Sequence, residues 1–495
     1  MPDIRETLLG LPTSEVKERK KVKRDYYFYK GECKDIDAAK VDKVLLGQSW
    51  DVNDNVDYTP TQDIRNKTKP LLKKQARFMF GNEPFILFKP DNLDDKDKCE
   101  GLRRFVDDVL ESNKFWNNTR KAFLMSTIKK RILLRVEANP DMPIIIKYEN
   151  IEDFYYKEQN GRLLEVKFFE DDEENVFKDS DSGKIYYIHT YYYDKQDGAS
   201  DYEAFYMKQT YKGDDLNKPT EEITQATGFE NIPCWLIKNG GELGDDFGES
   251  DVDDLRELQN KYNRKNSDFA DALRFQMFGA EAVIDGEKED VDSLTVAPNA
   301  LHAIRTNSEA AEQGKQAIIQ RLEYSMGNAE AANSYLNRLD EDMRSILDMP
   351  SVKDLSNIPS AKAMKYLYND LIGRCEEKWN DWEPILKELI GFIITAGKHC
   401  YKDKFKDEWS KLKYTIIFTH NYPLPSDDED KKKLALEEVN ANVRSRTSYI
   451  KEFTDEEDAE SALEQILDEI QMVNAAEQDQ YQKGVNQEIN SGGVS

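Results

Sequence analysis

Two stretches with helical hydrophobic spacing, residues 333–347 and 360–398, lie on either side of a polar segment. Their apolar residues recur every three or four positions, which predicts two amphipathic helices. The second helix would be on the order of 55–60 Å long, with a bend at Pro384, whose ring removes a backbone hydrogen bond. The segment between them, residues 348–360, is small, polar and bounded by prolines, so we predict a loop.

Another helical pattern precedes these, over residues 249–276. Ser250 suits the N-cap of this helix, and the acidic residues after it favour the positive end of the helix dipole. Residues 277–326 combine short β signals, turns and an Ala/Gln-rich helical pattern. The chain is therefore predicted to run out along one helix, form a small module and return along residues 327–347.

The remaining patterns predict a mixed α+β protein. Residues 13–24 and 62–80 have the spacing of basic amphipathic helices. Residues 143–237 are rich in β signals separated by Asn-Gly, Asp-Gly and Lys-Gly turns. A strand is expected at residues 414–419, followed by polar helices, and residues 477–495 have the composition of a disordered tail.

The composition indicates a folded, strongly acidic protein. Of its 495 residues 34% are charged, mean hydropathy is −0.79, and the formal net charge is −27. Proteins that grip nucleic acid by its phosphates normally have the opposite charge, so DNA is either no partner or passes without being held. No apolar run is long enough for a membrane span and no signal peptide is recognisable, which predicts synthesis and use in a cytosol or in particles assembled there.

No arrangement of residues indicates catalysis, a metal or a cofactor. The five cysteines are far apart without a CxxC pair, which favours buried thiols, and the four histidines have no metal-binding spacing. No GxxxxGK(S/T) phosphate loop is present, which excludes a nucleotide-driven motor of this type, and the GxSxG motif is absent as well. Pro90-Asp91 with Glu165-Val166-Lys167 resembles a nuclease pattern, but such coincidences are expected at this charge content. A nuclease is therefore the least favoured alternative.

Several short motifs follow one another in a recognisable order. They are Tyr26-Tyr27 with Gly31, Gly81-Asn82-Glu83-Pro84, Asn231-Ile232-Pro233-Cys234, Gly248-Glu249-Ser250-Asp251, Tyr335-Leu336-Asn337-Arg338-Leu339, Ser360-Ala361-Lys362-Ala363-Met364 and Asn421-Tyr422-Pro423. Together, over roughly residues 26–474, they resemble the portal proteins of tailed bacteriophages, of the type found in phages of Gram-positive hosts.

The resemblance implies a ring, usually of twelve subunits, at one vertex of a virion capsid. Such a ring is the conduit for double-stranded DNA during packaging and ejection. It would bind the terminase large subunit, the major capsid and scaffolding proteins and a head-completion or adaptor protein, with no membrane involved. Assembly would take place in the cytoplasm of the bacterial host. The runner-up is a different structural or adaptor ring of a phage or phage-like particle, without a DNA conduit.

The resemblance also implies a division of the chain into named parts. These are a β-rich wing (1–248), a first stem helix (249–276), a small α/β clip (277–326), a second stem helix (327–347), a tunnel loop (348–360), a further part of the wing with the long kinked helix and a strand (361–430), a helical crown (431–476) and a disordered tail (477–495).

Three groups of candidate functional residues result. The tunnel loop would face DNA with Val352, Lys353, Asp354, Leu355, Ser356, Asn357 and Ile358, of which Lys353 would touch phosphates. Arg338 and Arg344 on the second stem helix either form basic rings in the channel or pair with acids such as Asp340. The apolar stripes of the stem helices need partners, so we assign them to the core or the subunit interface. The residues so assigned are Val252, Leu255, Tyr262, Phe269, Tyr335, Leu339 and Met343.

Overall fold

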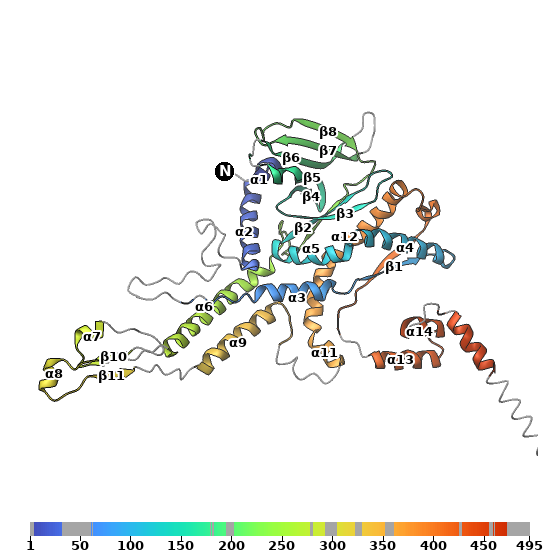
Figure 1. Ribbon diagram of the computed structural model, residues 1–495. Helices are drawn as coiled ribbons and strands as arrows, with labels where there is room; N and C mark the ends of the chain where they lie inside the picture. Colours follow the sequence, from blue (N-terminus) through green and yellow to red (C-terminus); the bar gives the residue numbers. More distant parts are fainter. Residues whose placement is uncertain are drawn as a thin grey trace, which may run out of the picture. The chain divides into compact units, whose positions relative to one another are not determined.

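The computed structural model describes residues 4–31, 61, 63–178, 180, 183–194, 202–277, 281–292, 304–321, 329–351, 361–424, 428–454, 459 and 461–472 (Figure 1). The chain forms two compact units. One unit comprises Met1–Leu355 with Tyr368–Pro423, and the other comprises Ser356–Leu367 with Leu424–Ser495. Helices and strands both contribute substantially, which confirms the predicted α+β class.

The helices of the first unit are α1 (Ile4–Leu9), α2 (Thr13–Lys30), α3 (Thr68–Phe80), α4 (Lys96–Ser112), α5 (Phe115–Lys129), α6 (Asp251–Met277), α7 (Lys288–Asp292), α8 (Ser308–Glu312), α9 (Ala329–Ile346) and α12 (Asn369–Cys400). The second unit contains α11 (Ala361–Leu367), α13 (Asp428–Asn440), α14 (Arg446–Phe453) and helical residues 461–472.

The strands are β1 (Phe85–Pro90), β2 (Arg131–Glu137), β3 (Ile145–Asn150), β4 (Phe154–Gln159), β5 (Arg162–Asp171), β6 (Ile185–Asp194), β7 (Glu203–Lys212), β8 (Glu221–Ala226), β9 (Cys234–Lys238), β10 (Glu281–Ile284), β11 (Ile318–Arg321) and β12 (Tyr414–Thr419). Within the described residues these strands pair antiparallel and form four sheets, with the orders β4-β5-β6-β7-β8, β3-β2-β9, β1-β12 and β10-β11.

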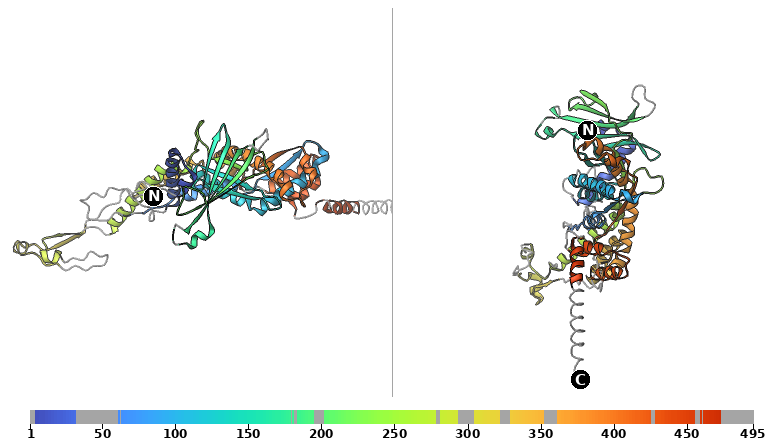
Figure 2. Two further views of the ribbon diagram at one scale, coloured as in Figure 1. Left: turned by 90° about the horizontal axis from the view of Figure 1, so that it is seen from above. Right: turned by 90° about the vertical axis from the view of Figure 1, so that its right-hand side faces the viewer.

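The five-stranded sheet follows chain order because each strand turns back beside its predecessor (Figure 2). Its two faces bury different clusters. Phe154 and Phe168 pack with Leu133 of the three-stranded sheet, whereas Phe169 and Ile188 pack with α1. The sheet is therefore held from both sides, which fixes its orientation in the first unit.

Helix α12 passes through the core of the first unit. Trp382 is 1% exposed, and its ring lies near those of Phe80, Phe123 and Tyr148. The prediction of one helix over residues 360–398 is wrong, because a turn at Tyr368 separates α11 from α12. The chain remains helical through Pro384.

Three other predicted elements have different bounds. Helix α2 continues past residue 24 to Lys30, since Phe28 is buried, and it ends at Gly31, whose φ of 68° suits glycine. Helix α3 begins at Thr68, not at residue 62. In the predicted Ala/Gln-rich helix only α8 forms, because Gly314 turns the chain with φ 75° and β11 follows.

Candidate functional site: the two stem helices and their junctions

We call α6 and α9 the stem helices, because they correspond to the two helices predicted around the small module. They pack side by side, with the β10-β11 pair at their far ends (Figures 1 and 2). Ser250 accepts a hydrogen bond from the Val252 N–H (3.3 Å), as expected of the cap at the start of α6. Gly248 is also required there, because its φ is 77° and a Cβ would lie 2.8 Å from the Lys130 carbonyl oxygen.

The chain itself covers most of the predicted apolar stripes. Five of the seven proposed interface residues are buried within the single chain, whereas Phe269 and Tyr335 are half-buried. The buried five are Val252, Leu255, Tyr262, Leu339 and Met343. Phe269 and Tyr335 are thus the members of this set with surface left for a second subunit.

A row of polar side chains on α6 holds another part of the chain, which we call the strap (residues 61 and 63–67). Alternate backbone N–H groups of the strap donate to side chains four residues apart on α6. The pairs are Lys67 with Gln259 Oε1 (2.8 Å), Arg65 with Asn263 Oδ1 (3.1 Å), Asp63 with Ser267 Oγ (3.0 Å) and Thr61 with Asp271 Oδ1 (3.0 Å). All four acceptor residues are buried.

The spacing of these four pairs has a geometric origin. Four residues of an α-helix rise about 6.0 Å, and two residues of an extended chain span about 6.6 Å. Every second N–H of the strap can therefore meet every fourth residue of α6. Sequence reasoning missed the row, because polar residues at helical spacing are also typical of a solvated helix face. Because the strap residues are held along α6, helix α3 begins at Thr68 and not at residue 62 as predicted.

A buried charge cluster joins the start of α6 to α12. Lys378 Nζ lies 3.1 Å from Asp251 Oδ1 and 2.7 Å from Asn239 Oδ1, and Arg374 Nη2 lies 3.4 Å from Asp251 Oδ2. Burial by itself would raise the pKa of Asp251. The charges of Lys378 and Arg374 and the hydrogen bonds outweigh that effect, so the pKa of this carboxyl lies below its usual range.

Arg374 also reaches the end of α9. Its Nη1 lies 3.3 Å from the carbonyl oxygen of Ile346 and 3.4 Å from Asp348 Oδ2. Asp348 has φ 55°, so the chain turns sharply where α9 ends. One side chain of α12 thus connects the first turn of α6 with the last turn of α9. The predicted tunnel-loop residues 352–358 begin just beyond this point and lie outside the described residues.

A second charged junction links α2 to α6. Asp25 is fully buried and accepts a hydrogen bond from Arg256, with Arg24 Nε 3.6 Å away. Arg256 also binds Asp253 (2.6 Å), whose carboxylate is 41% exposed. Burial, followed by the charge of Asp253, raises the pKa of Asp25 to about 6 despite the two arginines.

The two arginines on α9, both predicted as candidate channel residues, have different surroundings. Arg344 Nε lies 3.1 Å from Asp340 Oδ2 on the same helix, and Lys67 of the strap contacts the other oxygen of Asp340 at 3.1 Å. Arg338 is exposed, and its guanidinium lies over the ring of Tyr335 at 5.1 Å. The charge of Arg344 is therefore shared with a carboxylate in its own chain, whereas Arg338 presents its charge at the surface.

Comparison with known families establishes the identity of the chain. The family described as Phage portal protein, SPP1 Gp6-like, matches residues 12–476 of the 495. The chain belongs to this family of phage portal proteins. Among curated proteins no match is found.

The assignment confirms the resemblance found in the sequence motifs. Phage portal proteins are structural, and the family implies a homo-oligomeric ring in a virion capsid with capsid and terminase partners. Within the described part of this portal protein, no group of His, Cys, Asp or Glu side chains is placed to hold a metal ion. No helix in those same residues is long and apolar enough to cross a membrane.

Proposed function

We propose that this portal protein forms a ring of twelve subunits at one capsid vertex, through which double-stranded DNA passes during packaging and ejection. The observation that carries the proposal is the pair of stem helices, tipped by the β10-β11 module, in a chain whose family match spans nearly its whole length. A hairpin of this kind, repeated around an axis, supplies the wall of a channel.

The charge of the chain supports a conduit that does not hold DNA tightly. Each subunit contributes a net charge of −27, so phosphates are repelled overall, and each additional phosphate contact would increase salt-dependent affinity. Of the two arginines on α9, Arg338 is the one whose side chain is exposed, which makes it the better candidate for a basic ring. Lys353, with Ser356 and Asn357, is proposed to touch phosphates as DNA moves.

The partners follow from the proposed position at the vertex. The β10-β11 end would receive the terminase large subunit during packaging and the head-completion or adaptor protein afterwards. The β-rich part of the first unit would contact the major capsid and scaffolding proteins. Assembly in the cytoplasm of the bacterial host is part of this proposal.

Negative-stain microscopy of the purified protein tests the ring. Turbine-shaped particles with a central hole are expected, whereas a compact monomer that cleaves DNA with added metal would support the nuclease instead. A ring without a role in DNA passage would support the adaptor alternative. That role is tested by Lys353→Ala in a packaging assay that measures nuclease-protected DNA. The matched control is Lys365→Ala, a change of an exposed lysine on α11. We expect reduced protection for the first variant only.

A further inference from the structure

An apolar pair projects from the turn between β5 and β6. Val176 is 86% exposed and Phe177 is 87% exposed, at the end of a short 3-10 turn, Glu173–Phe177. We call Val176 and Phe177 the knob. Exposure of two adjacent large apolar side chains costs free energy unless something covers them.

The turn that carries the knob is firmly built. The side chain of Asn175 is buried and bonds both backbone groups of Ile185, accepting from its N–H at 2.8 Å. Asp172 accepts from the Glu174 N–H (3.0 Å) and from the Tyr187 hydroxyl (2.7 Å). These bonds tie the backbone just before the knob to the start of β6, so the knob is carried by an ordered turn.

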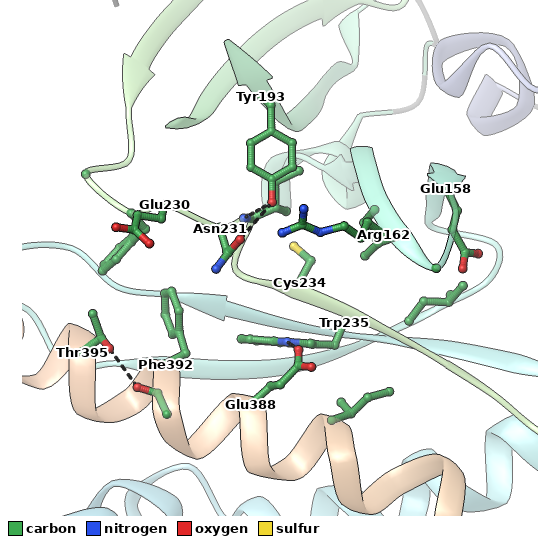
Figure 3. A pocket seen from close by; sticks show the side chains of 18 of the residues that line it. Glu158, Arg162, Tyr193, Glu230, Asn231, Cys234, Trp235, Glu388, Phe392 and Thr395 are labelled. Carbon is green, nitrogen blue, oxygen red and sulfur yellow. Dashed lines mark hydrogen bonds between the residues drawn. The ribbon is translucent and has the colours of Figure 1, made fainter. Parts of the chain in front are cut away.

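A groove of about 1050 Å³ lies between the five-stranded sheet, β9 and α12 (Figure 3). Its floor is aromatic. The ring of Phe392 lies 4.7 Å from that of Phe229 and 5.7 Å from that of Trp235, and Gly391 leaves open space beside them. Its rim carries charges of both signs, from Glu158, Arg162, Glu230, Lys238, Asp381 and Glu388.

The knob and the groove lie at opposite ends of one sheet. Strand β5 begins at Arg162 in the groove and ends at Asp171, immediately before the turn with the knob. Strand β6 returns from that turn to Tyr193, which again lines the groove. Ten residues of strand separate the two ends by about 33 Å. Because both features belong to one sheet, their separation is fixed.

A closed ring of identical subunits needs two different patches that fit each other. In a head-to-tail ring each subunit presents two different, complementary patches on opposite sides, so that each patch meets its counterpart on a neighbour. We propose that the knob of one subunit inserts into the groove of the next. Phe177 would contact the aromatic floor, while Glu173 and Glu174 would face Arg162 on the rim, since Lys238 already pairs with Glu158 (3.0 Å). The inference rests on the ring of the proposed function and assigns one of its contacts.

Disulfide cross-linking tests the contact in the full chain. Phe177→Cys and Thr395→Cys place one thiol on the knob and one on the exposed wall of the groove, in a Cys33→Ser background. The four other native cysteines are buried. Mild oxidation should give a ladder of linked oligomers up to the full ring, which reductant reverses. The matched control joins Thr395→Cys to Leu93→Cys, since Leu93 is 85% exposed on another turn, and should give no ladder.

Each outcome decides a different point. A ring seen by microscopy without the 177–395 link overturns this contact and leaves the proposed function intact. Dimers linked through position 177 alone would mean a two-fold contact, which also overturns it. An unmodified chain that never forms rings defeats both proposals. As a second measure, Phe177→Asp should raise the concentration needed for ring assembly by about tenfold or more, whereas Leu93→Asp should leave it unchanged.

Discussion

A fall in pH from 7 to 5 should stabilise the junction between α2 and α6, because Asp25 takes up a proton there. The carboxyl is fully buried and has a pKa of about 6, against 3.8 in an unfolded chain. A pKa raised by folding means that the folded chain binds the proton more tightly. The resulting stabilisation is complete below pH 3.8 and is lost as the pH rises through about 6.

The size of this effect follows from the difference between the two pKa values. A difference of about two pH units corresponds to at most ~3 kcal/mol of unfolding free energy. About 1.3 kcal/mol of it appears between pH 7 and pH 5, since the folded carboxyl is then largely protonated and the unfolded one is not. Other groups titrate in the same range, so the comparison must be made against a variant that lacks this proton site.

Urea unfolding followed by tryptophan fluorescence, at pH 7 and pH 5, measures the effect. The stability of the native chain relative to Asp25→Asn should increase by about 1.3 kcal/mol from the higher to the lower pH. Asp253→Asn is the control, because it removes the nearby carboxylate that helps to raise the pKa of Asp25. Between pH 7 and pH 5 this variant should gain less unfolding free energy than the native chain does. An Asp25→Asn difference that is equal at both pH values would refute the reasoning.

Three further predictions concern the stem helices. Gln259→Ala removes the acceptor of the N–H groups of Lys67 in the strap and Thr68 at the start of α3, so thermal unfolding should show a loss of about 2–4 kcal/mol. A loss below 1 kcal/mol would contradict the role of this junction. Lys378→Met leaves the buried carboxylate of Asp251 with one cationic partner, Arg374, so unfolding free energy should fall by about 3 kcal/mol in the same assay. An unchanged unfolding free energy would show that the ion pair between Lys378 and Asp251 does not stabilise the fold. Tyr335→Asp should block ring assembly, which size-exclusion chromatography measures, whereas a change at the exposed Asn333, Asn333→Asp, should not. A Tyr335→Asp variant that elutes as a full ring would count against a subunit contact at this position.

The elements that sequence patterns predicted well are those in which the local signals agree with one another. Helix α6 matched because an N-cap, first-turn acids and an apolar stripe agree, and β12 matched because its alternation is regular and ends before Pro423. The break at Tyr368 was missed because no proline or glycine marks it, whereas Pro384, which does carry such a mark, lies inside a continuous helix. Local propensity is overridden there by the packing of α12 in the core.

The candidate site was predicted less completely than the fold. The position of the stem helices followed from their periodicity, but which side chains they bury depends on neighbours distant in the sequence. In the sequence Gln259 and Ser267 look like solvent-facing helix residues, but in the structure they accept hydrogen bonds from the strap. Asp251 likewise looks like an ordinary first-turn acid, but it binds Lys378 of α12. Contacts of this kind are set by the tertiary structure, so no local pattern could have revealed them.

The strap and α6 have slightly different spacings between successive hydrogen-bonding groups. The two repeats, about 6.0 Å along the helix and about 6.6 Å along the extended chain, differ by about 0.6 Å for each pair. Across the three steps between four pairs the offset reaches about 1.8 Å, which is more than a hydrogen bond tolerates without adjustment. The row therefore has a natural maximum length. A shift of the strap by one residue would move the N–H groups away from all four acceptors together, because the acceptors match only every second residue of the strap. The backbone N–H groups of the strap therefore set its position along α6 in steps of two residues.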